Sequence, residues 1–204
     1  MKAMFVSFIA ILFFLSGCEK IKQKETFYSD KKPKEKYTVT KQNGKEIKNG
    51  LYEAWFKNGK TKHVFNYLDD VKHGAQKTFY KSGTLQLKEQ HLFGKLMGKQ
   101  QKWDEQGNLI SETIFEDGKK SGEELIYFPS GKVNKKINYS SNQKNGIEII
   151  YDEAQSLISA AWYKEGQKIE APADSAIVVE KIVKEDTTTV KPKQPKADEE
   201  EKGV

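Results

Sequence analysis

Residues 74–97 read GAQKTFYKSGTLQLKEQHLFGKLM, and residues 98–121 read GKQQKWDEQGNLISETIFEDGKKS. Each stretch of 24 residues begins with glycine, has an aromatic residue five positions later, and has a second glycine nine positions after the first. The same unit starts again at residues 50, 122 and 146, so it occurs five times without an insertion or deletion. A fixed period of this length is typical of a stacked repeat architecture.

Three columns of residues define the unit, and we number positions as offsets from its leading glycine. The leading glycines are Gly50, Gly74, Gly98, Gly122 and Gly146. The aromatic residues at offset 5 are Trp55, Phe79, Trp103, Tyr127 and Tyr151. Offset 17 holds Tyr67, His91, Phe115, Tyr139 and Tyr163. The second glycine is present in four copies and is replaced by Gln155 in the fifth, which puts the geometry of that turn in doubt.

The second glycine predicts a β-hairpin in every unit. A three-residue loop such as Glu105-Gln106-Gly107 is a type I turn followed by a left-handed residue, a conformation that glycine adopts at no steric cost. This loop sets Phe79 opposite Leu85, and the equivalent pairs follow in the next copies. Because side chains alternate between the faces of a strand, we expect the odd offsets of both strands, including the aromatic offset 17, to form one core face.

The predicted fold is therefore all-β, with tandem 24-residue hairpins forming an extended antiparallel sheet or solenoid. One such hairpin is marginally stable in water, so the copies must stack. The repeat domain is expected over residues 37–169, with residues 37–49 as a degenerate cap. The pattern of spaced glycines, offset-5 aromatics and a glycine-lysine turn resembles the bacterial MORN-repeat variant, of the kind labelled a YwqK-type antitoxin. The resemblance implies hairpins in series and a role in binding or scaffolding.

The amino terminus resembles that of a bacterial lipoprotein. Lys2 precedes an apolar run at residues 3–15, which is too short to span a bilayer comfortably, and Leu15-Ser16-Gly17-Cys18 follows. The resemblance implies a signal peptide over residues 1–17 and acylation of Cys18, the single cysteine; the alternative is an ordinary cysteine after a cleaved signal. By analogy with enterobacterial sorting, the glutamate that follows favours the outer membrane.

Low-complexity segments are expected on both sides of the repeats. Residues 18–36 are lysine-rich and predict a flexible tether. Residues 170–204 predict a mostly disordered tail, in which residues 177–183 could form a strand or a short amphipathic helix. The chain of 204 residues carries a formal net charge of +6 from 35 lysines, with no arginine. Lysine lacks the planar fork that grips phosphate, so solubility is a better reading of the charge than nucleic-acid binding.

No catalytic, metal or cofactor site is predicted. His63, His73 and His91 fall at unrelated offsets and lack metal-ligand spacing. The adjacent carboxylates belong to strands or linkers, and the glycines are spaced for turns rather than clustered in a phosphate-binding loop. We therefore expect no small-molecule substrate and no enzymatic activity.

Apolar residues at even offsets, on the face expected to be polar, are the candidate binding surface. The candidates are Phe56, Tyr80, Phe128, Ile150 and Trp162. The alternative is that residues 177–183 pack over the fourth and fifth copies.

The sequence thus predicts a non-enzymatic cell-envelope lipoprotein that acts as a protein-binding or scaffolding platform through its repeat sheet. Two alternatives stay open: a toxin-neutralising immunity protein, which a toxin gene next door would favour, and a lipid- or glycan-binding module.

Overall fold

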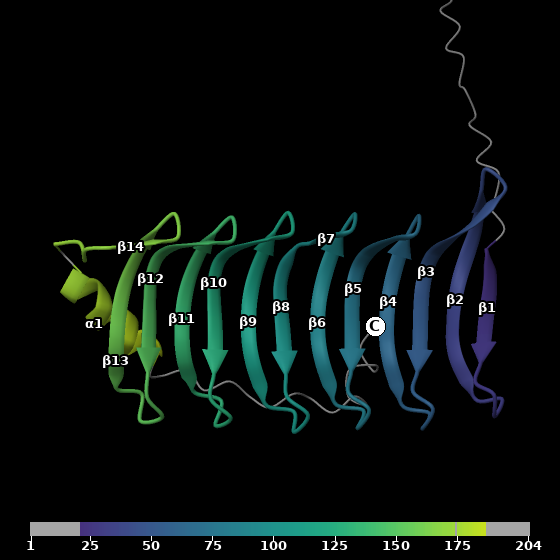
Figure 1. The fold of residues 1–204 in the computed structure, drawn as a ribbon, viewed down its shortest axis with the longest axis horizontal. Helices are drawn as coiled ribbons and strands as arrows, with labels where there is room; N and C mark the ends of the chain where they lie inside the picture. The colour runs from purple at the N-terminus through teal and green to yellow at the C-terminus, as the bar shows by residue number, and fades with distance from the viewer. Residues whose placement is uncertain (1–20, 174, 187–204) are drawn as a thin grey trace, which may run out of the picture.

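A computed structural model describes residues 21–173 and 175–186 of the chain. They form one open antiparallel sheet of fourteen strands and one helix (Figure 1). The strands of the first half are β1 (Lys22–Phe27), β2 (Pro33–Gln42), β3 (Lys45–Trp55), β4 (Thr61–Leu68), β5 (Val71–Phe79), β6 (Leu85–Leu92) and β7 (Lys95–Leu96). Those of the second half are β8 (Gly98–Trp103), β9 (Leu109–Glu116), β10 (Lys119–Tyr127), β11 (Val133–Ser140), β12 (Gln143–Tyr151), β13 (Leu157–Lys164) and β14 (Gln167–Ile169). The helix, α1, is Ser175–Asp186.

The strands lie in the order of the chain, except that the short β7 pairs with β6 beside β8. Each repeat supplies one hairpin, and successive hairpins stand side by side (Figure 1). The all-β hairpin-repeat fold expected from the 24-residue period is therefore confirmed.

The hairpin loops have the predicted geometry. In the third copy the amide of Gly107 donates to the carbonyl of Asp104 at 3.1 Å, and Gly107 has φ +87°. Gln155 adopts the same left-handed conformation, with φ +65°, so the fifth hairpin keeps its shape without glycine. The predicted register is also present, with Phe79 opposite Leu85. Each such aromatic and aliphatic pair contributes roughly 0.2 to 1 kcal/mol beyond burial.

The expectation that all odd offsets share one face is wrong, because each hairpin contains a β-bulge at offset 12. In the first copy Trp55 pairs with Thr61, whereas Ala54 pairs with His63, so Lys62 is the extra residue. The bulge reverses the alternation in the second strand. Offsets 14 and 16 therefore join offsets 1, 3, 5 and 11 on one face, and the aromatic offset 17 lies on the other.

We call the face that carries offsets 1, 3, 5, 11, 14 and 16 the core face. Its buried cluster consists of Leu85, Trp103, Leu109, Tyr127, Val133, Ile147, Ile149 and Tyr151. Val179 and Ile182 of α1 pack against this cluster, as do Ala160 and Trp162. Residues 177–183 were expected, as one alternative, to cover the even offsets of the fourth and fifth copies. A helix does pack on the sheet there, but it covers the core face instead. Residues 187–204 lie outside the described residues.

The amino-terminal hairpin is complete. We expected a flexible tether up to residue 36, but β1 occupies Lys22–Phe27 and β2 already begins at Pro33. The polar sequence of β1 did not predict a strand. The strand pairs with β2, with Lys24 opposite Tyr37 and Lys36 opposite Glu25. Backbone pairing, rather than apolar burial, therefore defines this edge. The expected signal peptide and Cys18 lie outside the described residues.

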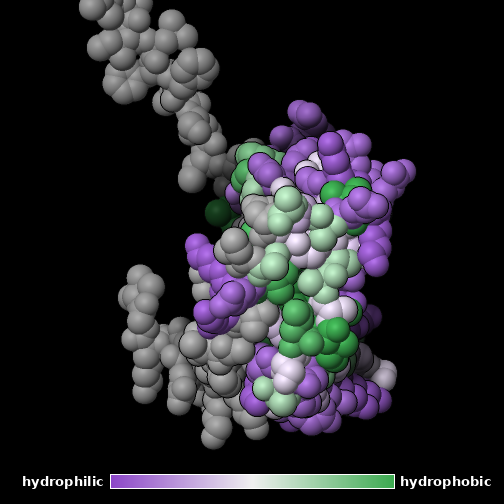
Figure 2. Space-filling model, turned by 90° about the vertical axis from the view of Figure 1, so that its left-hand side faces the viewer, coloured by the Kyte–Doolittle hydropathy of each residue, from purple (hydrophilic) through white to green (hydrophobic). Residues whose placement is uncertain are grey.

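The carboxy-terminal end of the sheet carries exposed apolar side chains, which Figure 2 shows gathered on the end surface. They include Leu157 and Ile158 of β13 and Ile169 of β14. Within the described part of the chain, no helix has the length and apolar character needed to cross a membrane.

Candidate functional surfaces

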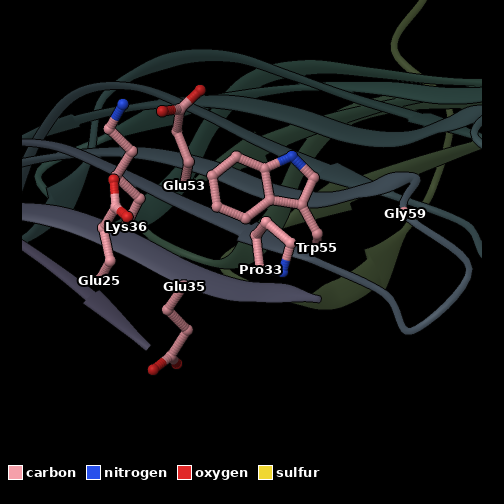
Figure 3. A pocket seen from close by; sticks show the side chains of 7 residues that line it. All are labelled: Glu25, Pro33, Glu35, Lys36, Glu53, Trp55 and Gly59. Atoms are coloured by element: carbon pink, nitrogen blue, oxygen red, sulfur yellow. The ribbon is translucent and has the colours of Figure 1, made fainter. Parts of the chain in front are cut away.

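The sheet offers two faces of different chemistry, and the core face carries a hollow. A pocket of about 470 Å³ opens at its amino-terminal end, where Trp55 of β3 stands beside Pro33 of β2 (Figure 3). The hydroxyl of Tyr28 donates to the carbonyl of Trp55 at 2.8 Å, which fixes this strand end against the neighbouring loop. The pocket wall is therefore built from an aromatic ring held in place by the first hairpin.

Acidic side chains surround this ring. Glu25, Lys36 and Glu53 follow one another across β1, β2 and β3 on the same face, and Figure 3 shows them on the same side of the strands as Trp55. Glu35, which also lines the pocket, points to the opposite side. The pocket thus combines an indole with two carboxylates and one lysine, an arrangement suited to a cationic or amide-bearing side chain of a ligand.

The charge changes sign farther along the core face. Lys77 of β5 and Lys88 of β6 are directly opposed, and Lys88 in turn faces Gln101 of β8. This pairing brings two positive charges together near the middle of the core face. The core face therefore runs from an acidic end at β1–β3 to a basic centre at β5–β6.

We call the opposite side the ladder face, because lysines and aromatic rings alternate along it. The lysines stand two residues before a leading glycine and are Lys48, Lys72, Lys120 and Lys144. The Nζ of Lys120 lies 4.8 Å from the ring centroid of Tyr139, and that of Lys144 lies 4.6 Å from Tyr163. The Nζ of Lys72 lies 4.4 Å above Phe65. Leu96 takes the place of the lysine in the third copy.

Carboxylates complete the ladder. Lys120 donates to Glu124 at 2.6 Å and Lys144 donates to Glu148, both four residues farther along the same strand. Burial alone would raise the pKa of Glu124, but Lys120, with the hydroxyls of Thr113 and Tyr139, lowers it below its ordinary value. Burial, together with Glu124, raises the pKa of Tyr139 to about 12. Lys72, Lys120 and Lys144 are thus each engaged by a ring and a carboxylate, which makes the ladder a device for joining repeats rather than an anion site.

The amino-terminal end of the ladder is aromatic. The Nζ of Lys48 lies 5.1 Å from the ring centroids of both Tyr52 and Tyr67, and the hydroxyl of Tyr52 donates to Glu35 at 2.7 Å. Burial, with the hydrogen bond to Glu35, raises the pKa of Tyr52. The hydrogen bond from Tyr52 in turn lowers the pKa of Glu35. This network ties the first hairpin to the repeats.

Three of the residues predicted to bind, Phe56, Tyr80 and Phe128, lie half-buried at the hairpin loops. The hydroxyl of Tyr80 donates to the carbonyl of Trp103 in the next repeat at 2.9 Å, as Tyr28 does to Trp55. Phe56 lies beneath the Nζ of Lys62, 5.8 Å from its ring centroid. Tyr80 therefore joins two neighbouring hairpins, whereas the contact of Phe56 lies within its own hairpin.

The other two predicted residues lie on different faces. Ile150 pairs with Ser159 on the ladder face, whereas Trp162 pairs with Ile147 and packs against the core cluster that α1 also covers. The five candidates therefore form no common surface. Lysines that recur every 24 residues are the sequence signal that could have predicted the ladder.

The histidines stand apart from one another. His63 stacks on Phe65 with ring centroids 4.7 Å apart, and His73 lies against Phe93. His91 lies 3.8 Å from Glu89, and burial lowers the pKa of both His63 and His91. Among the described residues, no group of three histidine, cysteine or acidic side chains could hold a metal ion.

Two segments of the chain match the family model described as MORN repeat variant, namely residues 72–92 and 120–141. Each begins at a ladder lysine and covers one hairpin, β5–β6 or β10–β11. The chain is therefore similar to this family over two of its repeats, and this family is not a family of enzymes. A search of curated proteins finds no match to the chain.

Proposed function

We propose that this protein is a binding platform without catalytic activity, anchored in the cell envelope, whose core face holds an extended segment of a protein partner. The similarity to MORN repeats supports a repeat-based binding module. The main support for the proposal is the core face. Its aromatic pocket at Trp55 continues into a row of opposed side chains that changes from acidic to basic.

The length of this face favours a polymer over a small molecule as its ligand. Thirteen strands in sequence at about 4.8 Å give a sheet on the order of 60 Å long, and α1 covers the core face only at its carboxy-terminal end. An extended peptide crossing several strands would place its basic side chains near Glu25 and Glu53 and its acidic ones near Lys77 and Lys88. The reversal of charge then fixes the direction in which the partner lies.

We choose the core face because the ladder face is already engaged by contacts within the protein. There the lysines are held by rings and carboxylates of the protein itself, so a partner would have to break those contacts to use them. The pocket residues Glu53 and Trp55 are half-buried and border an open hollow.

Photo-crosslinking in intact cells tests this assignment. A photoreactive amino acid at Glu53, in the pocket, should capture one protein partner that mass spectrometry identifies. The matched control is Lys102, an exposed residue of the ladder face. Equal capture from both positions, or no capture from Glu53, contradicts the proposal. Capture of a toxin encoded beside this gene would instead support the immunity function.

The anchor is the second part of the proposal. Acylation of Cys18 would hold β1 close to the membrane, because only three residues separate Cys18 from Lys22, where the first strand begins. A sheet attached so closely lies near the bilayer, rather than swinging on a long tether.

Substitution of Cys18 by serine tests the anchor. Cys18→Ser should abolish incorporation of labelled fatty acid and leave the precursor unprocessed, since the acylated cysteine is the proposed attachment point. Normal labelling of the variant would rule the anchor out. The sheet should fold equally well in both proteins, as circular dichroism can check.

A further inference from the structure

The turns that join one hairpin to the next lie along one edge of the sheet, which we call the linker edge (Figure 1). Both residues of each turn have positive φ, and the turns are Asn43-Gly44, Asp69-Asp70, Phe93-Gly94, Asp117-Gly118, Ser141-Asn142 and Glu165-Gly166. The first residue is polar in all of these turns except Phe93, which has φ +47° and is 67 % exposed. A bulky side chain is unfavourable in this conformation, and its exposure leaves the strain without compensation from burial. Folding alone therefore does not explain Phe93.

Further exposed apolar side chains lie beside Phe93. Leu92 precedes it and Met97 follows the same turn, and both are exposed. Val71 of the preceding turn is exposed as well and lies close to Gly94, where an added Cβ would come within 2.7 Å of its Cγ1. We call Val71, Leu92, Phe93 and Met97 the apolar tip. The next repeat has polar residues at the positions of the last three, namely Glu116, Asp117 and Ser121. The tip is therefore specific to this turn.

The lysine next to this turn is already paired. The Nζ of Lys95, which follows Gly94, lies 2.6 Å from a carboxylate oxygen of Asp117 in the next turn. Phe93 itself rests against the ring of His73, with ring centroids 4.9 Å apart. The tip thus offers apolar and aromatic surface rather than a free positive charge. Such surface suits the interfacial region of a bilayer, where aromatic side chains are favoured.

The start of the chain favours a bilayer over a protein as the ligand of the tip. β1 begins at the linker edge, because Lys22 pairs with Val39, three residues before β2 ends at Gln42 (Figure 1). Cys18 lies three residues before Ile21, a distance of at most about 11 Å. A strand of eight residues such as β6 is about 27 Å long, so Cys18 cannot reach the hairpin loops at the other edge. An acyl chain on Cys18 therefore brings the linker edge next to the membrane.

We propose that the apolar tip is a second membrane contact, in which Phe93 enters the interfacial region of the bilayer that holds Cys18. This contact rests on the acylation of Cys18 given under the proposed function. From β1 to β6 there are five strand spacings, about 24 Å, so two separated points would hold the sheet upright on the membrane. The hairpin loops, with the pocket at Trp55 and Gly59, then lie at the edge away from the membrane, where a partner can reach them.

Quenching by brominated phospholipid tests this contact. The acylated protein is purified from membranes and reconstituted into vesicles of zwitterionic lipid without any other protein. In Phe93→Trp, the brominated lipid should reduce the added fluorescence at least twofold, measured against the unsubstituted protein, and Met97→Trp should respond in the same way. The matched control is Gln106→Trp, at an exposed hairpin loop on the other edge, which should be quenched little. No quenching of Phe93→Trp, or equal quenching of Gln106→Trp, overturns the contact.

Lipid charge and salt give a second readout. Because the tip is apolar, the quenching of Phe93→Trp should stay the same in vesicles with added anionic lipid and when salt screens the surface charges. Loss of quenching in salt would show attraction through lysines and would overturn the apolar contact.

Mass spectrometry of the purified protein reports the acylation of Cys18 separately. An acylated protein without quenching refutes the tip alone, whereas a protein without acyl chains refutes the anchor and the tip with it. Neither result bears on the capture of a partner at Glu53.

Discussion

At the scale of single residues, the loop glycines carry the hairpin geometry. Gly107 has φ +87°, and the nearest atom to an added Cβ is the Cγ2 of Thr84 at 3.7 Å, so backbone conformation rather than space limits substitution. Gly107→Val should reduce the free energy of unfolding by roughly 1 to 2 kcal/mol, measured by urea denaturation. Gly107→Asn is the matched control and should cost less, because asparagine tolerates positive φ. Equal stability of the valine variant and the native protein would contradict the turn.

Gln155 shows why this position was hard to predict in the fifth copy. Its side-chain amide donates to the carbonyl of Val133 at 2.9 Å and reaches that of Asp152 at 3.2 Å. These bonds compensate for the left-handed backbone that glycine adopts freely elsewhere. The doubt raised by the missing glycine was therefore reasonable from the local turn, and a contact 22 residues away removed it.

The lowered pKa of Glu124 predicts that the free energy of unfolding depends on pH in the acidic range. Its folded pKa lies below the reference value of 4.5, so the stability it contributes is present above about pH 4.5 and is lost as the pH falls through the lowered folded pKa. Glu124→Gln should flatten the decline of the unfolding free energy in this acidic range. Lys120→Met should raise the pKa of Glu124, because the lysine that offsets the effect of burial is then missing. Carbon NMR titration measures this pKa. An unchanged pKa in that variant would contradict the lysine ladder.

At the scale of elements, the hairpin and its register were predictable, whereas the sharing of faces was not. The spaced glycines determine the loop, and the loop determines the pairing of Phe79 with Leu85. The bulge at offset 12 has no residue signature, since its members are Lys62, Gln86, Ile110, Asn134 and Ile158. It moved the offset-17 aromatics to the ladder face and Trp162 to the core face, which separated the predicted binding residues.

Helix α1 provides a matched pair of substitutions. Val179 packs against the core cluster, whereas Val178 is 38 % exposed. Val179→Asp should release the helix, because the carboxylate would lose its hydration against apolar side chains. Hydrogen exchange of residues 175–186 should then accelerate by about tenfold or more, a free-energy change of about 1.4 kcal/mol. Val178→Asp should change the exchange little. The same response in both variants would contradict the packing.

At the scale of the whole molecule, the sheet grows by one hairpin per repeat, and it stays open, with β1 and β14 as its two edge strands. The amino-terminal hairpin escaped sequence analysis because β1 has lysine and glutamate where the repeats have columns of glycine and aromatic residues. The exposed apolar end at β13 and β14 and the charge reversal along the core face are likewise properties of the assembled sheet, and no single unit displays them.

Deletion of one unit tests the modular sheet most directly. Residues 98–121 can be removed so that residue 97 joins Gly122, and spin labels can be placed at the exposed loop positions Lys57 and Glu153 in a Cys18→Ser background. The shortened protein should fold cooperatively, and the distance between the labels should fall by about 10 Å, two strand spacings. Removal of residues 98–109 alone, half a unit, should prevent folding because the register is lost. An unchanged label distance, or unfolding on removal of the whole unit, would contradict a sheet built from equal, stacked hairpins.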